Sequence, residues 1–325
     1  MRKGRHLILA LIGAALFSWV VARVGLPAIL QQLSAMRLAL PILLTLSVCR
    51  LLLQTTAWSA ALRGEGICVA PERLIGIRLA SQSMGYLTFL GAVLSEPLKI
   101  KLLRAPTEST IKATFLDSGV YWFTSVLVTI IGCLCAAFFA IHDAHHAWTA
   151  LPVTLLILVL FFIARTKPIL TGFVRVLGRH CPSWLAHGES LERSIRDYRR
   201  QQPALVSRMF WIDIACQLLT VSEVAVVVWS LQLPIHLVTV LAIEGITRTL
   251  KMLSGWIPAR LGVDEGGAMS AFLAVGLSPV SGLTLALTRR MRDLLWALIG
   301  LAWLVWRSPD VTGRERLKET YAITR

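Results

Sequence analysis

Residues 245–266 read GITRTLKMLSGWIPARLGVDEG, and this stretch gives the clearest indication of the architecture. It is largely apolar, but glycine, proline and charged residues interrupt it, which disfavours one continuous transmembrane helix. An earlier stretch, residues 76–97, reads GIRLASQSMGYLTFLGAVLSEP. Both contain, in the same order and at closely similar spacings, an arginine, a glycine, an aromatic residue, a Leu-Gly pair, a valine and a glutamate. The two stretches therefore predict a duplicated element.

Basic residues flank the first copy on both sides, which places both of its ends on the same side of a membrane. A segment that enters and leaves on one side is a re-entrant hairpin, and such backbone is tolerated only where it is buried in protein or lines a polar cavity. Three apolar windows separate the copies, at about 113–140, 148–165 and 205–232. An odd number of crossings inverts the second copy, as in inverted-repeat transporters.

The overall composition excludes a soluble enzyme and a disordered chain. Of 325 residues, 56% are hydrophobic and only 16% are charged, whereas soluble domains are about 45–50% apolar and about 25% charged. Windows long enough to cross about 30 Å of hydrocarbon occur at about 6–25, 38–61, 113–140, 148–165, 205–232 and 281–306.

We therefore predict an all-α polytopic membrane protein with about six full transmembrane helices and two re-entrant hairpins in an inverted repeat. Residues 1–325 would form a single integral membrane domain. Repeat one would cover about 74–140 and repeat two about 237–306. Whether residues 266–280 belong to the second hairpin or form a separate span stays open.

The net charge of +15 is mainly a topology signal. Five segments (1–5, 62–75, 96–112, 165–203 and 307–325) hold 22 of the 33 Lys and Arg residues, and the loops that alternate with them hold only Arg37. The positive-inside rule then predicts a bacterial inner-membrane protein with both termini and a loop at about 166–203 in the cytoplasm. The surplus of positive charge therefore does not indicate a nucleic-acid partner.

Ten basic and seven acidic residues lie inside the apolar segments. A charge at the bilayer centre costs about 2.5–3.5 kcal/mol on insertion scales, so these residues predict a polar cavity within the helix bundle. The alternative is that the polar stripes only hold helices together. The predicted substrate-binding residues are Arg78, Glu96, Asp117, Arg248, Lys251, Arg260, Asp264, Glu265, Arg289, Arg292 and Asp293.

Residues 257–266, IPARLGVDEG, resemble the P-x-G-x-G-x-x-E segment of the lysylphosphatidylglycerol synthase membrane domain, a flippase-like family. The resemblance continues through the arginine-bearing stretch 287–293 and includes the glutamate of Ser95-Glu96-Pro97. The chain departs from the family pattern at Ser95 and at Arg260, where the family usually has glycine. About 19 residues follow the last predicted span, so we expect a stand-alone member without the aminoacyl transferase domain. Related stand-alone proteins occur beside hopanoid biosynthesis genes.

This resemblance implies translocation of a charged lipid between leaflets. We expect an anionic or lipid-linked headgroup, with its phosphate, to cross by alternating access as one repeat rocks against the other. The phosphate would be held by Arg248, Lys251, Arg260, Arg289 and Arg292. Glu96 and Glu265 would pair with these cations in the absence of substrate, or would bind a cationic group such as a lysyl amine. The expected partners are membrane lipids (an anionic phospholipid, or a polyprenyl or hopanoid lipid), with a homo-oligomer or a lipid-synthesis enzyme as further possibilities.

No catalytic motif accompanies these residues. The sequence contains no P-loop, no Gly-x-Ser-x-Gly motif and no Cys-x-x-Cys pair, so we expect a non-enzyme without cofactor or metal. The histidines of residues 142–146 are predicted to lie in a short outer loop, where a functional metal site is not expected. Two alternatives stay open: a glycosyltransferase that uses Asp264 and Glu265 on a polyprenyl-phosphate sugar, and a non-transporting partner of a lipid or hopanoid synthesis complex.

The inverted topology predicts that reporters fused after Ala144 and after Tyr198 lie on opposite sides of the membrane. The first reporter should be outside and the second in the cytoplasm, because one crossing separates the two positions. A paired alkaline phosphatase and green fluorescent protein fusion series would measure this. Signals from the same side at both positions would contradict the inverted repeat.

Overall fold

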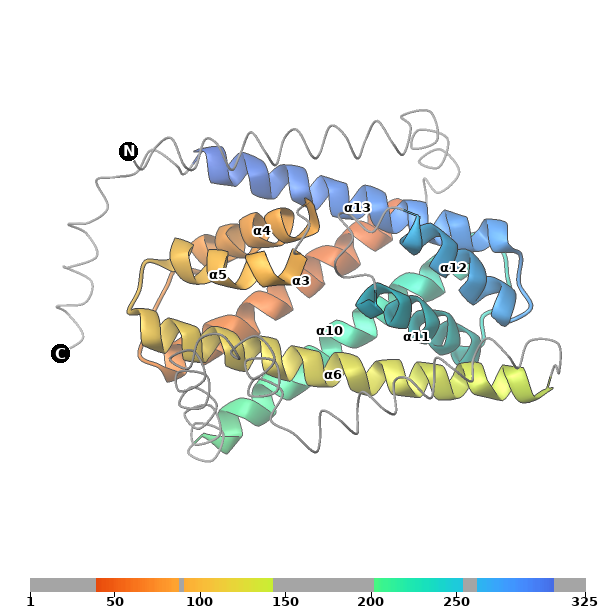
Figure 1. Ribbon diagram of the computed structural model, residues 1–325, viewed down its shortest axis with the longest axis horizontal. Coiled ribbons are helices and arrows are strands. Elements are labelled where there is room, and N and C mark those ends of the chain that lie inside the picture. The colour runs from red at the N-terminus through yellow and green to blue at the C-terminus, as the bar shows by residue number, and fades with distance from the viewer. Residues whose placement is uncertain (1–38, 88–90, 143–201, 254–261, 307–325) are drawn as a thin grey trace, which may run out of the picture.

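The computed structural model describes residues 39–87, 91–142, 202–253 and 262–306, and the statements below concern these residues. They form eight helices in two groups of four, each with the order long, short, short, long (Figure 1). The first group is α3 (Ala39–Gly64), α4 (Pro71–Leu87), α5 (Gly91–Leu103) and α6 (Thr107–His142). The second group is α10 (Pro203–Ser230), α11 (Leu237–Leu253), α12 (Val263–Ala274) and α13 (Pro279–Trp306).

The described part of the chain is all-helical, as predicted for an all-α membrane protein. Helices α3, α6 and α10 are long and apolar enough to cross a membrane. Helix α13 has 28 residues, but four charged side chains interrupt its apolar character near the middle. These four helices correspond to the windows at 38–61, 113–140, 205–232 and 281–306, whereas the windows at 6–25 and 148–165 and the loop at 166–203 lie outside the described residues.

The two interrupted stretches fold as pairs of short helices. Helix α4 packs on α5, and α11 packs on α12. These helices contain 17, 13, 17 and 12 residues, so each is about 18–26 Å long at 1.5 Å per residue and is shorter than the hydrocarbon core. We refer to α4 with α5 as the first hairpin and to α11 with α12 as the second. Figure 1 shows the two hairpins entering the bundle from opposite ends.

The two groups of helices interlock. Helix α6, which follows the first hairpin, packs along α11 of the second hairpin, and α13, which follows the second hairpin, packs along α4 of the first. Helix α3 packs along α10. In Figure 1, α6 and α13 run in opposite directions on either side of the bundle. The exchange of partners means that neither group buries its apolar faces without the other.

Glycines allow these two crossings to be unusually close. A Cβ atom on Gly132 of α6 would lie 2.7 Å from the Cα of Gly245 in α11. In the other crossing, a Cβ on Gly300 of α13 would lie 2.6 Å from the backbone carbonyl carbon of Leu79 in α4. Small residues at helix crossings are typical of membrane proteins, where van der Waals packing holds helices together.

Two separate apolar cores form, one around each hairpin. The core at the first hairpin includes Trp58, Leu74 and Met209, and the core at the second includes Ile243 and Phe272. Large apolar side chains also point outward from the long helices, as suits contact with lipid; among them are Trp122, Phe123, Leu134, Phe138, Trp211 and Leu218.

The crossing of α6 and α11 predicts that Gly132→Ala destabilises the protein by about 1–3 kcal/mol, because the added methyl group overpacks a backbone contact. Gly119→Ala is the matched control in the same helix. A Cβ at Gly119 meets no atom within 4 Å, and alanine has the higher helix propensity by up to about 1 kcal/mol. Thermal unfolding of the detergent-solubilised proteins measures both effects, and equal melting temperatures for the two variants would contradict the close crossing.

Candidate functional site

Polar residues occupy the stretch between the two apolar cores on all four long helices. On α10, for example, Met209 belongs to the first core and Val221 to the second, and the buried Asp213 and Gln217 lie between them. We call this layer the polar belt. With the charged residues that pair with it, the belt contains Ser47, Arg50 and Gln54 of α3, Asp117, Thr124 and Ser125 of α6, Asp213, Gln217 and Glu223 of α10, Glu244 and Arg248 of α11, and Arg289, Arg292 and Asp293 of α13.

Glu244 of α11 joins two arginines within the belt. Its Oε1 accepts a hydrogen bond from Nε of Arg248 at 2.5 Å, and its Oε2 accepts one from Nη2 of Arg289 at 2.5 Å. Glu244 is 1% exposed, so these charges have little contact with water. Ion pairs at such depth persist only when the charges compensate each other with good geometry. Glu244 thereby fastens the second hairpin to α13.

Glu223 of α10 gathers three more charged contacts. Its carboxylate accepts a hydrogen bond from Nη1 of Arg292, lies 4.0 Å from Nε of Arg289 and lies 3.8 Å from Nη1 of Arg50. Arg292 also donates to Oδ1 of its neighbour Asp293 at 2.8 Å. Glu223 thus connects α10 with α13 and α3.

Gln217 extends this network to α6. Its amide oxygen accepts a hydrogen bond from Nη1 of Arg248, and its amide nitrogen donates to Oγ1 of Thr124 at 3.4 Å. Arg248 also donates to Oγ of Ser125 at 3.2 Å. The contacts of Glu223, Glu244 and Gln217 form one network across α3, α6, α10, α11 and α13. Its four cations are Arg50, Arg248, Arg289 and Arg292, and its three anions are Glu223, Glu244 and Asp293. The network therefore has a formal charge of +1.

A second cluster of charges lies beside the first hairpin. Arg78 of α4 forms an ion pair with Asp117 of α6 at 3.3 Å and donates to the backbone carbonyl oxygen of Gln54 in α3. In α5, Nζ of Lys99 lies 2.8 Å from Oε1 of Glu96. The predicted residues Arg78, Glu96 and Asp117 thus share one region with Lys99, which is not among the predicted site residues.

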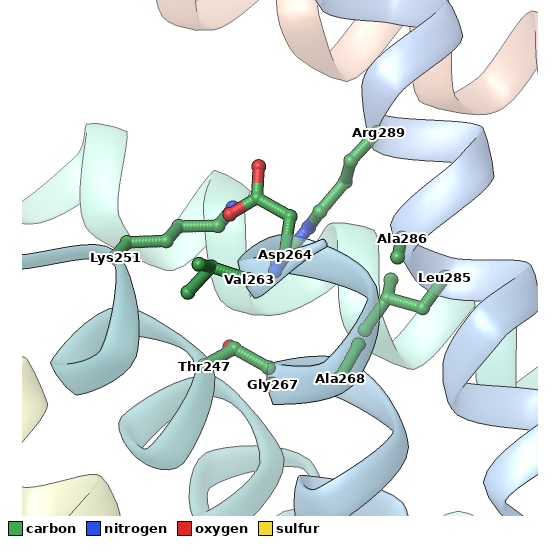
Figure 2. A pocket seen from close by; sticks show the side chains of 9 residues that line it. All are labelled: Thr247, Lys251, Val263, Asp264, Gly267, Ala268, Leu285, Ala286 and Arg289. Atoms are coloured by element: carbon green, nitrogen blue, oxygen red, sulfur yellow. The ribbon is translucent and has the colours of Figure 1, made fainter. Parts of the chain in front are cut away.

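A small pocket opens at the start of α12, between α11 and α13 (Figure 2). Its polar lining includes Lys251, Asp264 and Arg289. Figure 2 shows the side chains of Lys251 and Asp264 extending toward each other, with that of Arg289 beside them. The pocket therefore presents cations and a carboxylate together next to the positive end of the α12 dipole.

Glu265 lies beside this pocket and caps the N-terminus of α12. Its Oε2 accepts the backbone N–H of Gly262 at 2.9 Å, and its Oε1 lies 2.8 Å from Nη1 of Arg290. The expected partners of Glu96 and Glu265 were the phosphate-binding cations. In the structure they pair instead with Lys99 and Arg290, because those residues face them from the same helix or the adjoining one.

Ten of the eleven predicted residues are thus distributed over three places. Arg78, Glu96 and Asp117 lie at the first hairpin, Arg248, Arg289, Arg292 and Asp293 lie in the belt network, and Lys251, Asp264 and Glu265 lie at the start of α12. Arg260 lies outside the described residues, as do residues 143–146 of the histidine segment.

Sequence reasoning left out two carboxylates that the structure places at the centre of the network, Glu223 and Glu244. Both belong to the seven acidic residues inside apolar segments, and this position in the sequence is the feature that could have identified them. Glu244 also precedes Arg248 by four residues, a spacing that places the two side chains on one helix face.

One of three comparisons with known proteins identifies a membrane region in this chain. Neither the curated proteins nor the solved structures give a significant match. A family model described as the lysylphosphatidylglycerol synthase TM region matches residues 7–301, which include every described helix up to most of α13. The chain therefore belongs to the lysylphosphatidylglycerol synthase transmembrane-region family.

Proposed function

We propose that the protein moves the polar headgroup of a membrane lipid between the two leaflets. Membership of a lipid-related membrane family supports a lipid as the substrate. The observation that carries the proposal is the network of Arg248, Arg289 and Arg292 with Glu223 and Glu244, which joins α10, α11 and α13 inside the helix bundle. Charges at that depth are costly and mark substrate or ion pathways in membrane proteins.

The chemistry of the network suits a phosphate group. A guanidinium group presents parallel N–H donors that match phosphate oxygens, and charge-assisted hydrogen bonds of this kind are roughly twice as strong as neutral ones. Without substrate, Glu223, Glu244 and Asp293 compensate most of the positive charge. A phosphate would take the place of these carboxylates on some of the guanidinium groups, and the formal charge of +1 favours an anion.

The small pocket adjoins this network. Arg289 lines the pocket and also contacts Glu244, so a headgroup bound beside Lys251 would meet the edge of the belt. A cationic group on the same headgroup, such as a lysyl amine, would be bound by Asp264, Glu265 or Glu96. We propose that Arg260 contributes to the same headgroup site.

We propose that movement occurs by alternating access, with residues 74–140 and 237–306 as the two repeats that rock against each other. The lipid tails would stay in hydrocarbon while the headgroup passes along the belt. The proposed location is the bacterial inner membrane with both termini in the cytoplasm. In support, Figure 1 places the ends of α3, α5 and α13 and the start of α10 at one end of the bundle, and basic segments adjoin these ends.

Arg292→Ala and Glu265→Gln test the transport site. We expect each variant to slow the movement of a trace of acyl-labelled fluorescent phosphatidylglycerol by about tenfold or more, because a charge-assisted hydrogen bond contributes about 1.5–3 kcal/mol. The full chain is reconstituted in vesicles of phosphatidylethanolamine and phosphatidylglycerol, and quenching by dithionite reports the outer-leaflet fraction. Arg208→Ala is the control, because Arg208 is exposed on α10 outside the belt.

Unchanged transport in both site variants would refute the assignment of the site. The absence of lipid movement in the unsubstituted protein would favour the non-transporting partner of a lipid-synthesis complex. Sugar transfer from an added polyprenyl-phosphate sugar that is lost in Asp264→Asn would favour the glycosyltransferase.

The proposed compensation of cations by carboxylates also predicts a change in stability. Glu244→Gln should destabilise the protein by about 3–5 kcal/mol, because it leaves Arg248 and Arg289 buried without their carboxylate. Glu108→Gln should change stability by no more than about 1 kcal/mol, since the side chain of Glu108 is 81% exposed in its ion pair with Lys112. Thermal unfolding in detergent measures both variants, and a Glu244→Gln protein as stable as the control would contradict the compensation.

A further inference from the structure

Asp213 of α10 is a buried carboxylate that lies outside the network of Glu223, Glu244 and Gln217. Its side chain lies in the polar belt and the residue is 1% exposed. Within the described part of the chain, its Oδ2 has no hydrogen-bond partner. Glu223, Glu244 and Asp117 are equally buried in the belt, but each of them forms an ion pair with an arginine. Asp213 is therefore in a different physical situation from the other belt carboxylates.

The groups that face Asp213 come from several helices. Asp117 of α6 and Arg78 of α4 act on it electrostatically, and Cys216 lies one turn further along α10, where its Sγ contacts the backbone of Arg50 in α3. Arg78 is already engaged by Asp117 and by the carbonyl oxygen of Gln54, and Arg50 contacts Glu223. The cations near Asp213 are thus already paired with other acceptors.

The balance of charges in the cluster at the first hairpin indicates which protonation state of Asp213 the structure accommodates. Arg78 and Lys99 balance Asp117 and Glu96, two positive charges against two negative charges. An ionised Asp213 would leave one uncompensated negative charge in a desolvated site, next to the carboxylate of Asp117, and such a charge is strongly disfavoured. A proton on Asp213 makes the cluster neutral.

We propose that Asp213 is a proton-binding site, protonated in the conformation described here and deprotonated when the belt opens to water. The proton comes from the aqueous phase on one side and is released to the aqueous phase on the other. An ionised Asp213 competes with Asp117 for the guanidinium group of Arg78. Because Arg78 holds α4 to α3 and α6, loss of the proton loosens the first hairpin from its neighbours.

The belt also links this site to the cations of the second hairpin. Gln217 follows Asp213 by four residues, so the two side chains share one face of α10, and Gln217 accepts a hydrogen bond from Arg248. A shift of α10 at Asp213 therefore changes the position of a residue that holds Arg248. The two hairpins then have different tasks: the first binds the proton and the second binds the headgroup. This coupling to lipid rests on the proposed function, whereas proton binding by Asp213 does not.

Infrared difference spectroscopy tests the proton site without any transport. The spectrum of Asp213→Asn is subtracted from that of the unsubstituted full-length protein, both in detergent at neutral pH, and the C=O stretch of a protonated carboxylic acid is followed. We expect a band that persists at neutral pH, that is absent in Asp213→Asn and that is unchanged in the exposed control Glu108→Gln. Asparagine resembles the protonated aspartate side chain in shape and charge. The Asp213→Asn protein should therefore fold, with a melting temperature at or above that of the unsubstituted protein. A band that survives in Asp213→Asn, or no band at neutral pH, would overturn the proposal.

A pH gradient across the reconstituted vesicles tests the coupling. The same fluorescent phosphatidylglycerol is used as the probe. One-to-one coupling would shift its ratio between leaflets by up to about tenfold for each pH unit, because one unit corresponds to about 1.36 kcal/mol. Asp213→Asn resembles the protonated form and cannot release the proton, so the distribution of the probe between leaflets should not respond to the pH gradient.

The outcomes separate the two proposals. A gradient response that is retained in Asp213→Asn, or a response to a sodium gradient in place of the pH gradient, would overturn the proton-coupling role. If no lipid moves in the unsubstituted protein while the infrared band is present and depends on Asp213, then the proposed function fails and the proton site stands.

Discussion

The structure depends on the high cost of a charge that is buried in a membrane without compensation. Glu244 meets this constraint most directly, because its two carboxylate oxygens contact arginines from two different helices, Arg248 and Arg289. Removing these contacts would leave each of the three charges in a region where neither water nor lipid can solvate it. The ion pairs therefore determine which helices must lie together, and the apolar cores on either side fill the space around them.

The interlocked packing follows from the same constraint. Charged residues on α10, α11 and α13 can compensate one another only if the second hairpin reaches the middle of the bundle, and the polar belt is located there. Its long-helix neighbour α6 must approach closely, and Gly132 with Gly245 permits this approach. A network that spans five helices is rigid while its pairs are intact. The helix bundle has few other stable arrangements, because each of them must pair the same charged side chains in a different combination.

Much of this architecture can be predicted from the sequence. Apolar windows of sufficient length marked α3, α6, α10 and α13, because the length of a span is set by the thickness of the bilayer. The two interrupted stretches marked the hairpins, because glycine, proline and charged residues disfavour a continuous span. The position of charged residues inside apolar segments also marked the charged part of the belt, including Asp117, Arg289, Arg292 and Asp293. These properties are local, so a single chain reveals them without knowledge of its partners.

The pairing of charges could not be predicted in the same way. Glu265 pairs with Arg290, and Glu223 pairs with Arg292, although 69 residues separate the latter two in sequence. Which of several neighbouring arginines on one helix meets a given carboxylate depends on the rotation of that helix about its axis. This rotation is set by packing against α4 and α12, and the hydrophobic pattern of α13 alone does not define it. That Oδ2 of Asp213 has no hydrogen-bond partner among the described residues could likewise not be predicted, because it depends on how neighbouring helices are rotated.

The charged middle of α13 has a consequence for how the protein is made. Three arginines and an aspartate near its centre mean that this helix cannot partition into lipid on its own, since each charge opposes insertion by about 2.5–3.5 kcal/mol. The carboxylates that compensate them, Glu223 and Glu244, lie on helices that leave the ribosome earlier. Synthesis in this order presents α13 with its acidic partners already in the membrane. The last described helix is therefore inserted as part of an assembly, and the order of elements along the chain is itself a condition for reaching the folded state.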